Sequence, residues 1–244
     1  MTAPVLSAPI LSVRDVTKSF GPLRALGPVS FDLSRGERLG IIGPNGSGKT
    51  TLINCISGLL RNESGRIVFG EKDITSLAPY QRTRLGITRS FQVPRPFSTM
   101  SVLENLLVPT AYVLHLKDSE GEARAMEILE SMGLADKAQA LARELSQVEL
   151  RKLELARAMA AKPRLLISDE AMAGLAGNEV DEVLEILFAL NAKGITIIMI
   201  EHIMQAVMRF SQRVMCLDAG RIIALGTPAE VMADRRVQEA YLGT

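Results

Sequence analysis

The chain has 244 residues, enough for one large α/β domain with a real core. Its 28 basic and 27 acidic residues nearly cancel, which argues against a dedicated nucleic-acid surface or a surface for anionic membranes. Cys55 and Cys216 show no CxxC spacing, which suggests a reduced, cytosolic compartment, and no apolar run reaches the ~18 residues of a spanning helix. Residues 1–9 lack the pattern of a signal peptide, and we expect a disordered tail there.

Short apolar runs that end at glycine or at acidic residues alternate with stretches of helical period. Strands are predicted at residues 10–13, 29–33, 38–42, 66–69, 165–168, 195–200, 213–217 and 221–224. Strands that alternate with helices predict a mostly parallel sheet that is covered on both faces. Ligands then bind beyond the carboxyl ends of the strands.

The middle of the chain has a different pattern, with helical periods at residues 101–116 and 120–132. We therefore expect a helical subdomain, over about residues 76–160, that is inserted into the sheet domain. Another helix is predicted at residues 178–190, and short helices are predicted over residues 228–244. The whole of residues 10–244 is then one α/β domain.

The segment Gly43-Pro-Asn-Gly-Ser-Gly-Lys-Thr50 fits the P-loop pattern G-x-x-x-x-G-K-[ST] between a predicted strand and a predicted helix. Its glycines let successive backbone N–H groups face a phosphate, and the following helix N-terminus adds positive potential. Lys49 is expected to reach the β- and γ-phosphates, and the Thr50 hydroxyl can take Mg²⁺. This segment predicts binding of ATP or GTP.

A second apolar run, Leu165-Leu-Ile-Ser, ends in the acids Asp169 and Glu170. Alone, such a strand end is more often a solvated terminus, but a P-loop in the same domain reverses the odds. Asp169 could then orient Mg²⁺ through water, and Glu170 could polarise the attacking water. His202 ends a similar strand, where it is either structural or a contact to the γ-phosphate.

These motifs, together with Ala156-Arg-Ala-Met-Ala-Ala-Lys-Pro-Arg-Leu-Leu166, resemble the ATPase subunits of ABC transporters over essentially the whole chain. The resemblance implies a P-loop NTPase fold of class α/β, a mixed sheet core with an inserted helical subdomain, and hydrolysis of ATP with Mg²⁺. It implies that Glu170, His202 and Gln92 are catalytic. It also implies that Thr50, Gln92 and Asp169 form the site for Mg²⁺. The nucleotide contacts would be Phe20, Gly43, Pro44, Asn45, Gly46, Ser47, Gly48, Lys49, Thr50, Thr51 and Ser146.

Two of these roles have ordinary alternatives. Phe20 stands where the family stacks an aromatic ring on adenine, but an aromatic at a strand edge also packs in a core. Gln92 stands at the junction with the helical subdomain, where it could instead be an ordinary polar strand end.

The stretches around residues 19–31 and 87–92 and the final residues 226–244 look like the branched-chain amino acid uptake ATPases. Lipopolysaccharide-export ATPases have a similar ending and remain an alternative. The resemblance implies transmembrane permease subunits, a second ABC ATPase subunit and, indirectly, a periplasmic binding protein as partners. It places the chain peripherally on the cytoplasmic face of the inner (plasma) membrane. It implies no nucleic-acid partner.

The family's signature LSGGQ, which contacts the ATP of the opposite subunit, here reads Leu145-Ser-Gln-Val-Glu149. Ser146 and Glu149 predict a capping box. Gln147 and Val148 replace glycines, and a β-branched Val148 puts methyl groups where backbone N–H groups approach a γ-phosphate. The hypothesis is a weak signature in a heterodimer, with a tolerant homodimer as the alternative. A gating subunit with little turnover is a further alternative.

Overall fold

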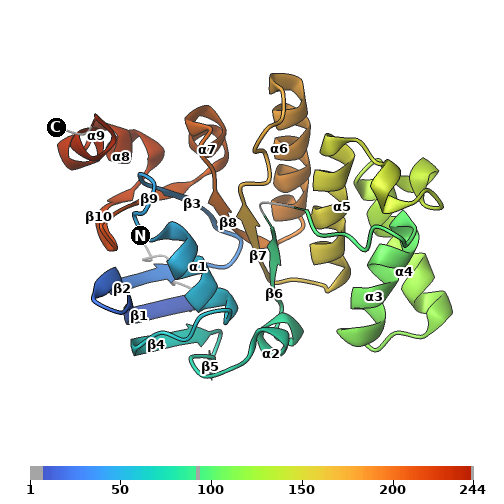
Figure 1. Cartoon of the computed structure of the whole chain (residues 1–244), viewed down its shortest axis with the longest axis horizontal. Coiled ribbons are helices and arrows are strands. Elements are labelled where there is room, and N and C mark those ends of the chain that lie inside the picture. Colours follow the sequence, from blue (N-terminus) through green and yellow to red (C-terminus); the bar gives the residue numbers. More distant parts are fainter. Residues whose placement is uncertain (1–7, 92–93, 243–244) are drawn as a thin grey trace, which may run out of the picture.

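The computed structural model describes residues 8–91 and 94–242, and Figure 1 shows two β-sheets with helices between and around them. The smaller sheet is antiparallel, and its strands lie in the order β2-β1-β4-β5. Its strands are β1 (Leu11–Phe20), β2 (Leu23–Leu33), β4 (Ser64–Phe69) and β5 (Lys72–Asp73). Gln92, predicted to be catalytic, and most of the predicted tail lie outside the described residues.

The larger sheet has the order β10-β9-β3-β8-β7-β6, and all its strands except β10 run parallel. The strands are β3 (Arg38–Ile42), β6 (Ile87–Ser90), β7 (Leu165–Asp169), β8 (Thr196–Ile200), β9 (Arg213–Asp218) and β10 (Arg221–Gly226). The predicted strands at residues 38–42 and 165–168 are therefore central strands. Their carboxyl ends lie at the same edge of the sheet.

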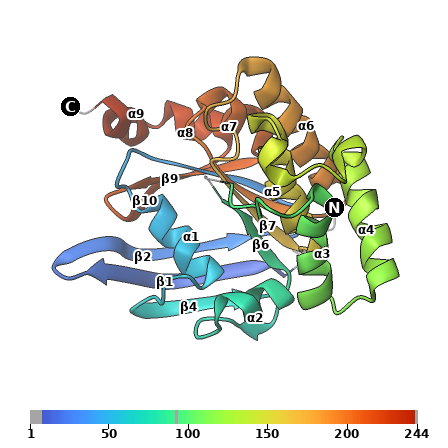
Figure 2. The same ribbon diagram turned by 45° about the vertical axis from the view of Figure 1, so that its right-hand side comes forward.

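Helix α1 lies between the two sheets, and α5, α6 and α7 cover the other face of the larger sheet (Figures 1 and 2). The helices are α1 (Lys49–Ser57), α2 (Pro79–Arg84), α3 (Val102–Tyr112), α4 (Asp118–Ser131), α5 (Gln147–Ala160), α6 (Gly177–Ala192), α7 (Met204–Phe210), α8 (Pro228–Ala233) and α9 (Arg235–Leu242), with 3-10 turns at Ala135–Lys137 and Ala142–Glu144. Within residues 8–91 and 94–242, no helix has the length and apolar character needed to cross a membrane.

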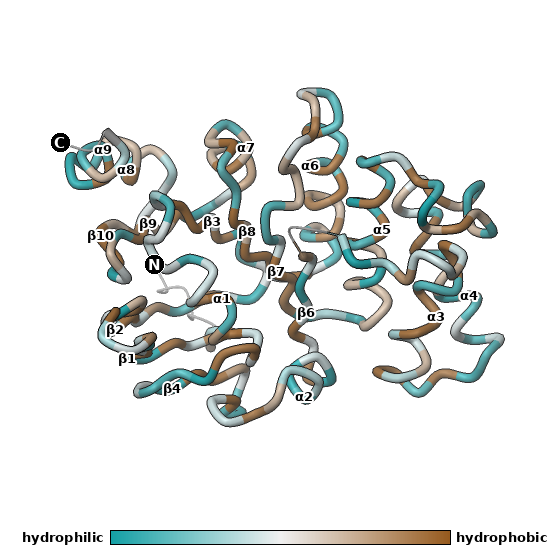
Figure 3. The backbone as a smooth tube through the Cα atoms, in the orientation of Figure 1, coloured by the Kyte–Doolittle hydropathy of each residue, from teal (hydrophilic) through white to brown (hydrophobic). Residues whose placement is uncertain are grey.

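Strand β8 shows why the larger sheet is buried on both faces. Ile198 and Ile200 point into the core that contains α1 and the smaller sheet, whereas Ile197 and Met199 point into the core under α5–α7. Successive side chains of a strand alternate between faces, so a strand between two cores reads as a continuous apolar run. The brown central strands in Figure 3 follow this pattern.

Strand β6 lies within residues 76–160, which the sequence predicts to be a helical subdomain. It pairs in parallel with β7, with Arg89 opposite Ile167 and Ser90 opposite Ser168. The sequence Ile-Thr-Arg-Ser lacks an apolar run, so the hydrophobic pattern does not reveal a strand there. The helices α3, α4 and α5 follow β6 and precede β7 in the chain.

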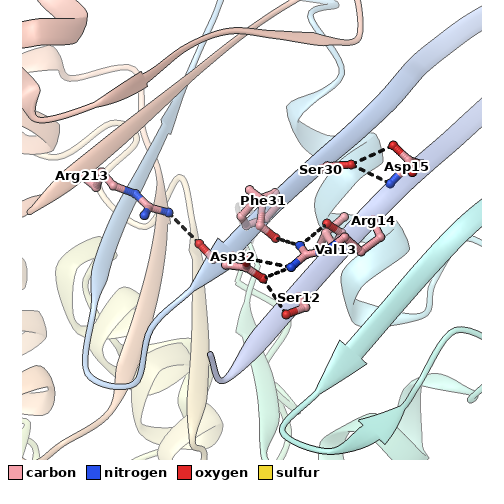
Figure 4. A network of polar contacts seen from close by, with 8 residues as sticks. All are labelled: Ser12, Val13, Arg14, Asp15, Ser30, Phe31, Asp32 and Arg213. Atoms are coloured by element: carbon pink, nitrogen blue, oxygen red, sulfur yellow. Dashed lines mark hydrogen bonds and ion pairs between the residues drawn. The ribbon is translucent and has the colours of Figure 1, made fainter. Parts of the chain in front are cut away.

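A surface network joins the two sheets near the start of β3 (Figure 4). The Arg14 guanidinium donates to both carboxylate oxygens of Asp32, at 2.6 and 2.7 Å, and Ser12 Oγ donates to Asp32 Oδ1 at 2.6 Å. Arg213 on β9 donates from Nη2 to the Asp32 carbonyl at 2.6 Å. Exposed ion pairs contribute little free energy, so this network adds little to the stability of the fold.

Candidate nucleotide-binding site

The P-loop connects β3 to α1, and two of its glycines are required by its close packing. Gly43 has φ +146°, and a Cβ there would lie 2.1 Å from the Leu217 carbonyl oxygen. Gly48 has φ +102°, and a Cβ there would lie 2.6 Å from the Ala25 carbonyl oxygen. Any side chain at either position would collide with backbone, so the loop can take this shape only with glycine.

Lys49 is buried and folds back over its own loop. Its Nζ donates to the carbonyl oxygens of Gly43 at 2.7 Å and Pro44 at 3.0 Å. Burial lowers the pKa of Lys49, and the carboxylates of Glu170 and Asp169 oppose that effect. An anion entering the loop would therefore meet an ammonium group that is already positioned and partly stripped of water.

A pocket of about 170 Å³ opens above this loop and helix α1. It is lined by Ala25, Asn45, Gly46, Ser47, Gly48, Lys49, Thr50, Thr51, Glu170 and His202. The first turn of α1 has no side-chain cap, and Ser47 Oγ is buried without a hydrogen-bond partner among the described residues. Uncapped N–H groups at a helix N-terminus, a lysine and a buried hydroxyl fit a phosphate group.

Glu170 and His202 both line this pocket and contact each other. His202 Nε2 lies 3.0 Å from Glu170 Oε1, and the Glu170 N–H donates to the Ile200 carbonyl at 2.8 Å. Glu170 has φ +50°, an uncommon value for a residue with a side chain. Such strain is often found at functional sites, and here it lies beside the pocket.

Asp169 is placed differently from the other predicted residues. It is 5% exposed, and its Oδ2 accepts from Arg89 Nη2 at 2.5 Å. It does not line the pocket of the P-loop, whereas Thr50 does. The Thr50 hydroxyl and the Asp169 carboxylate are oxygen donors, the type that Mg²⁺ prefers. Among the described residues no group of three His, Cys, Asp or Glu side chains could hold a metal.

Phe20 and Ser146 also lie outside the pocket lining. Phe20 is 47% exposed at the end of β1, and Lys18 Nζ lies 5.5 Å from its ring centroid. The alternative that Phe20 packs in the core is therefore wrong, because nearly half of the residue faces solvent. Ser146 is exposed at the N-terminus of α5.

The segment Leu145–Glu149 forms the predicted capping box. Ser146 N–H donates to Glu149 Oε2 at 2.8 Å, and Glu149 N–H donates to Ser146 Oγ at 3.4 Å. Lys137 Nζ lies 2.5 Å from Glu149 Oε1, and this contact is the main reason that the pKa of Glu149 falls to about 2. Val148 packs against the core under α5, and the Gln147 side chain lies against Gly174.

Sequence reasoning missed two side chains that hold the loop after Glu170. The buried Glu201 accepts from the Met172 N–H at 2.8 Å, and Arg151 Nη2 donates to the Ala173 carbonyl at 2.9 Å. Burial raises the pKa of Glu201 to about 7. The only signal in the sequence was the position of Glu201 directly before His202.

A third missed residue comes from the end of the chain. The Gly43 N–H donates to the Tyr241 hydroxyl at 2.7 Å, so α9 contacts the first glycine of the P-loop. In the sequence, Tyr241 stands out only as part of an ending typical of a subtype. A contact between positions this far apart leaves no local pattern.

A second hollow, a groove of about 360 Å³, is lined by residues of α2, β6, α3 and α5. Its walls include Phe91, Phe97, Tyr112 and Arg157, and the guanidinium of Arg157 stacks 5.2 Å from the Phe97 ring centroid. Phe91, Phe97 and Tyr112 are all exposed. We call this hollow the β6–α3 groove.

Comparisons with known proteins show which family this chain resembles. Residues 26–173 match the family described as "ABC transporter", and residues 221–244 match the family described as "Branched-chain amino acid ATP-binding cassette transporter". A "Probable branched-chain amino acid transport ATP-binding protein LivG" from Methanocaldococcus jannaschii is 36% identical, with 96% of this chain and 97% of the relative covered. The "High-affinity branched-chain amino acid transport ATP-binding protein LivG" of Salmonella typhimurium is 38% identical, with 98% and 99% covered.

Solved structures give the same result for the fold. The crystal structure of the ADP conformation of an ATP-binding cassette of an ABC transporter superposes with a TM-score of 0.89 at 35% identity, covering 98% of this chain and 100% of the other. A nucleotide-free cassette superposes with a TM-score of 0.89, also at 35% identity, covering 97% and 100%. The predicted α/β fold with a P-loop and mixed strands is confirmed.

Proposed function

We propose a role for each part of the site from the premise that this chain belongs to the ABC transporter family, as an ATP-binding subunit of the branched-chain amino acid type. It is an ABC transporter ATPase, and the roles of its residues are our proposal. The P-loop residues and Lys49 hold the phosphates of ATP, while Phe20 offers its exposed ring to the adenine. The observation that carries this proposal is the pocket in which Glu170 and His202 face Lys49 and Thr50.

The chain's own groups support hydrolysis as follows. Glu170 takes a proton from the attacking water, and His202 steadies the Glu170 carboxylate across their 3.0 Å contact and meets the γ-phosphate. Lys49 stabilises the negative charge that develops on the phosphate oxygens. Thr50 and Asp169 would hold Mg²⁺, which, when bound, neutralises charge on the β- and γ-phosphates. Gln92 would act with them at the junction before α3.

The partners are also inferred. The β6–α3 groove has exposed aromatic walls, which suit a segment of a transmembrane permease, and the chain would then work at the cytoplasmic face of the inner membrane. The relatives named LivG are transport proteins for branched-chain amino acids, so we propose the same class of solute, delivered by a periplasmic binding protein. A second ATPase subunit would complete each ATP site.

The replacement of both signature glycines, and not the packing of Val148, supports an asymmetric pair of sites. Val148 contributes to the core under α5, so its methyl groups are part of the helix packing. Glu149 is already paired with Lys137, so its negative charge repels a phosphate less than the sequence alone suggests. Loss of one phosphate donor to Val148 would lower hydrolysis at the opposite site by about 100–1,000-fold. We therefore propose a heterodimer in which this chain contributes the weak signature.

ATP hydrolysis by the purified chain, with nucleotide binding measured separately, tests this proposal. We expect ADP and ATP to bind but turnover to be slow, and Glu170→Gln to keep binding while removing the remaining turnover. Replacing Gln147 and Val148 together by glycine should raise turnover by at least tenfold, because backbone N–H groups become accessible in a homodimer.

The controls separate the two parts of the proposal. The double glycine variant combined with Glu170→Gln must be inactive, or the added activity is a contaminant. Fast hydrolysis by the unmodified chain, lost in Glu170→Gln, would mean that the signature works in a homodimer and that no stronger partner is needed.

A further inference from the structure

Arg89, on β6, joins three parts of the nucleotide site. Its Nη2 donates to Asp169 Oδ2 at 2.5 Å, and its Nη1 donates to Asn54 Oδ1 on α1 at 2.6 Å. The side chains of Arg89 and Asp169 are 9% and 7% exposed, so this ion pair is nearly dry. A buried pair with good geometry is held much more firmly than a surface pair.

The Asp169 carboxylate is held by Arg89 and does not line the pocket above the P-loop. Glu170 and Thr50 line the pocket above the P-loop, whereas Asp169, one residue before Glu170, does not. One oxygen of its carboxylate is committed to Arg89 beneath α1. A carboxylate that serves a magnesium ion bound near Thr50 would have to share or release that oxygen.

The other face of Arg89 leads to the β6–α3 groove. The Arg89 guanidinium carbon lies 5.3 Å from the centroid of the Phe91 ring, and Phe91 is 40% exposed. Both residues line the groove. Any group that moves the Phe91 ring therefore removes a cation–π contact from the guanidinium that holds Asp169.

We propose that Arg89 is a positioning residue that latches Asp169, so that it sets the affinity of the nucleotide site for Mg²⁺, and that Phe91 connects this latch to the groove. The proposal rests on the proposed role of Asp169 toward Mg²⁺. We call the Arg89–Asp169 ion pair the latch. While this ion pair is intact, Arg89 neutralises the charge of Asp169, so Asp169 attracts the metal less. A partner segment that displaces Phe91 loosens the latch and frees Asp169 for the metal.

An arginine suits this task better than a lysine. The planar guanidinium presents two donors side by side, so it can hold Asn54 and Asp169 at the same time, while its face remains free for Phe91. A lysine ammonium can keep the charge but cannot keep this arrangement. Arg89→Lys should therefore weaken the latch while leaving a positive charge beside Asp169.

The first test measures how Mg²⁺ changes the binding of ADP, with no turnover involved. A fluorescent ADP analogue is titrated in EDTA and then at increasing Mg²⁺ concentrations. We expect Arg89→Gln to bind ADP normally in EDTA and to reach half of the Mg²⁺ effect at about one-tenth of the Mg²⁺ concentration, because a neighbouring positive charge is lost and Asp169 is released. An unchanged or higher Mg²⁺ midpoint would overturn the proposal.

The chain offers a matched control. Arg84, on α2, stacks on Tyr80 with its guanidinium carbon 5.7 Å from the ring centroid. Both residues are exposed, and neither lines the groove or the P-loop pocket. Arg84→Gln and Tyr80→Leu should therefore leave the Mg²⁺ midpoint unchanged.

The second test uses the connection to the groove. Phe91→Leu should lower the Mg²⁺ midpoint by about threefold, since it removes the stacked ring but keeps the ion pair. Equal midpoints for Phe91→Leu and Tyr80→Leu would refute the connection. Removing one member of a buried ion pair is destabilising, so Arg89→Gln could fail to fold. Phe91→Leu keeps the ion pair and can still be measured in that case.

Failure of the proposed function would give a different experimental result. If the unmodified chain does not bind ADP in EDTA or with Mg²⁺, the proposed nucleotide site is wrong. If it binds ADP in both, and Mg²⁺ titrates equally in all variants, only the latch is wrong.

Discussion

At the scale of single residues, the site combines predicted groups with a carboxyl that the motifs do not include. Glu201 lies one residue before His202, is 3% exposed, and accepts the Met172 N–H within the loop after Glu170. The structure brings it close enough to Glu170 that the two acids repel each other. Both this repulsion and burial favour the protonated form of Glu201.

The raised pKa of Glu201 makes stability depend on pH. Its pKa is about 7 in the folded chain against 4.5 for an ordinary glutamate, so the folded state holds the extra proton between these values. The stabilisation is complete below about pH 4.5 and is lost as the pH rises through 7. Relative to Glu201→Gln, the unmodified chain should lose about 3 kcal/mol of unfolding free energy between pH 5 and 8.

Urea unfolding of both chains at a series of pH values gives this difference. Glu120→Gln, at an exposed position on α4, serves as the control and should follow the unmodified chain. Parallel pH curves for Glu201→Gln and the unmodified chain would show that Glu201 does not carry the effect.

At the scale of elements, α5 shows how one segment serves a fold and a site together. Its N-terminus is fixed by Ser146 and Glu149, and Glu149 is also tied to Lys137. The same first turn would have to meet the ATP of the opposite subunit. Substitutions that keep the cap and the core contact of Val148 are compatible with folding, whatever they do to phosphate binding.

Ser146 therefore has a structural effect that can be measured by itself. Ser146→Ala should lower the unfolding free energy by about 1 kcal/mol, because the Glu149 N–H loses its acceptor, whereas Ser146→Asp keeps an acceptor and should stay within about 0.5 kcal/mol of the unmodified chain. Thr227→Ala, at the matching capping box of α8, should cost a similar amount. A neutral Ser146→Ala would mean that the 3.4 Å contact contributes nothing.

At the scale of the whole molecule, the nucleotide site is assembled from distant parts of the chain. The P-loop follows β3, Glu170 follows β7 and His202 follows β8, and parallel pairing brings these ends to one edge of the sheet. The turn between β9 and β10 closes the other side, where Gly220 N–H donates to the Ser47 carbonyl at 3.0 Å. The C-terminal helix then reaches the same loop through Tyr241.

The Tyr241 contact predicts a link between the end of the chain and the P-loop. Tyr241→Phe should lower the unfolding free energy by about 1 kcal/mol, the usual net value of one hydrogen bond. It should also speed hydrogen exchange at the Gly43 amide, because that N–H loses its acceptor. Tyr112→Phe, at an exposed position on α3, is the control. Unchanged exchange at Gly43 would argue against the link.

The sequence alone determined the P-loop, the acids after Leu165-Leu-Ile-Ser, the strand end with His202 and the capping box, because each depends on neighbours within about eight residues. It also determined the family, whose motifs are local. Only the tertiary structure decided that Asp169 pairs with Arg89, that Glu201 is buried and that Tyr241 meets Gly43. These contacts join strands or helices far apart in the chain. Burial and pairing across a sheet depend on which elements become neighbours, and no short stretch of residues encodes that.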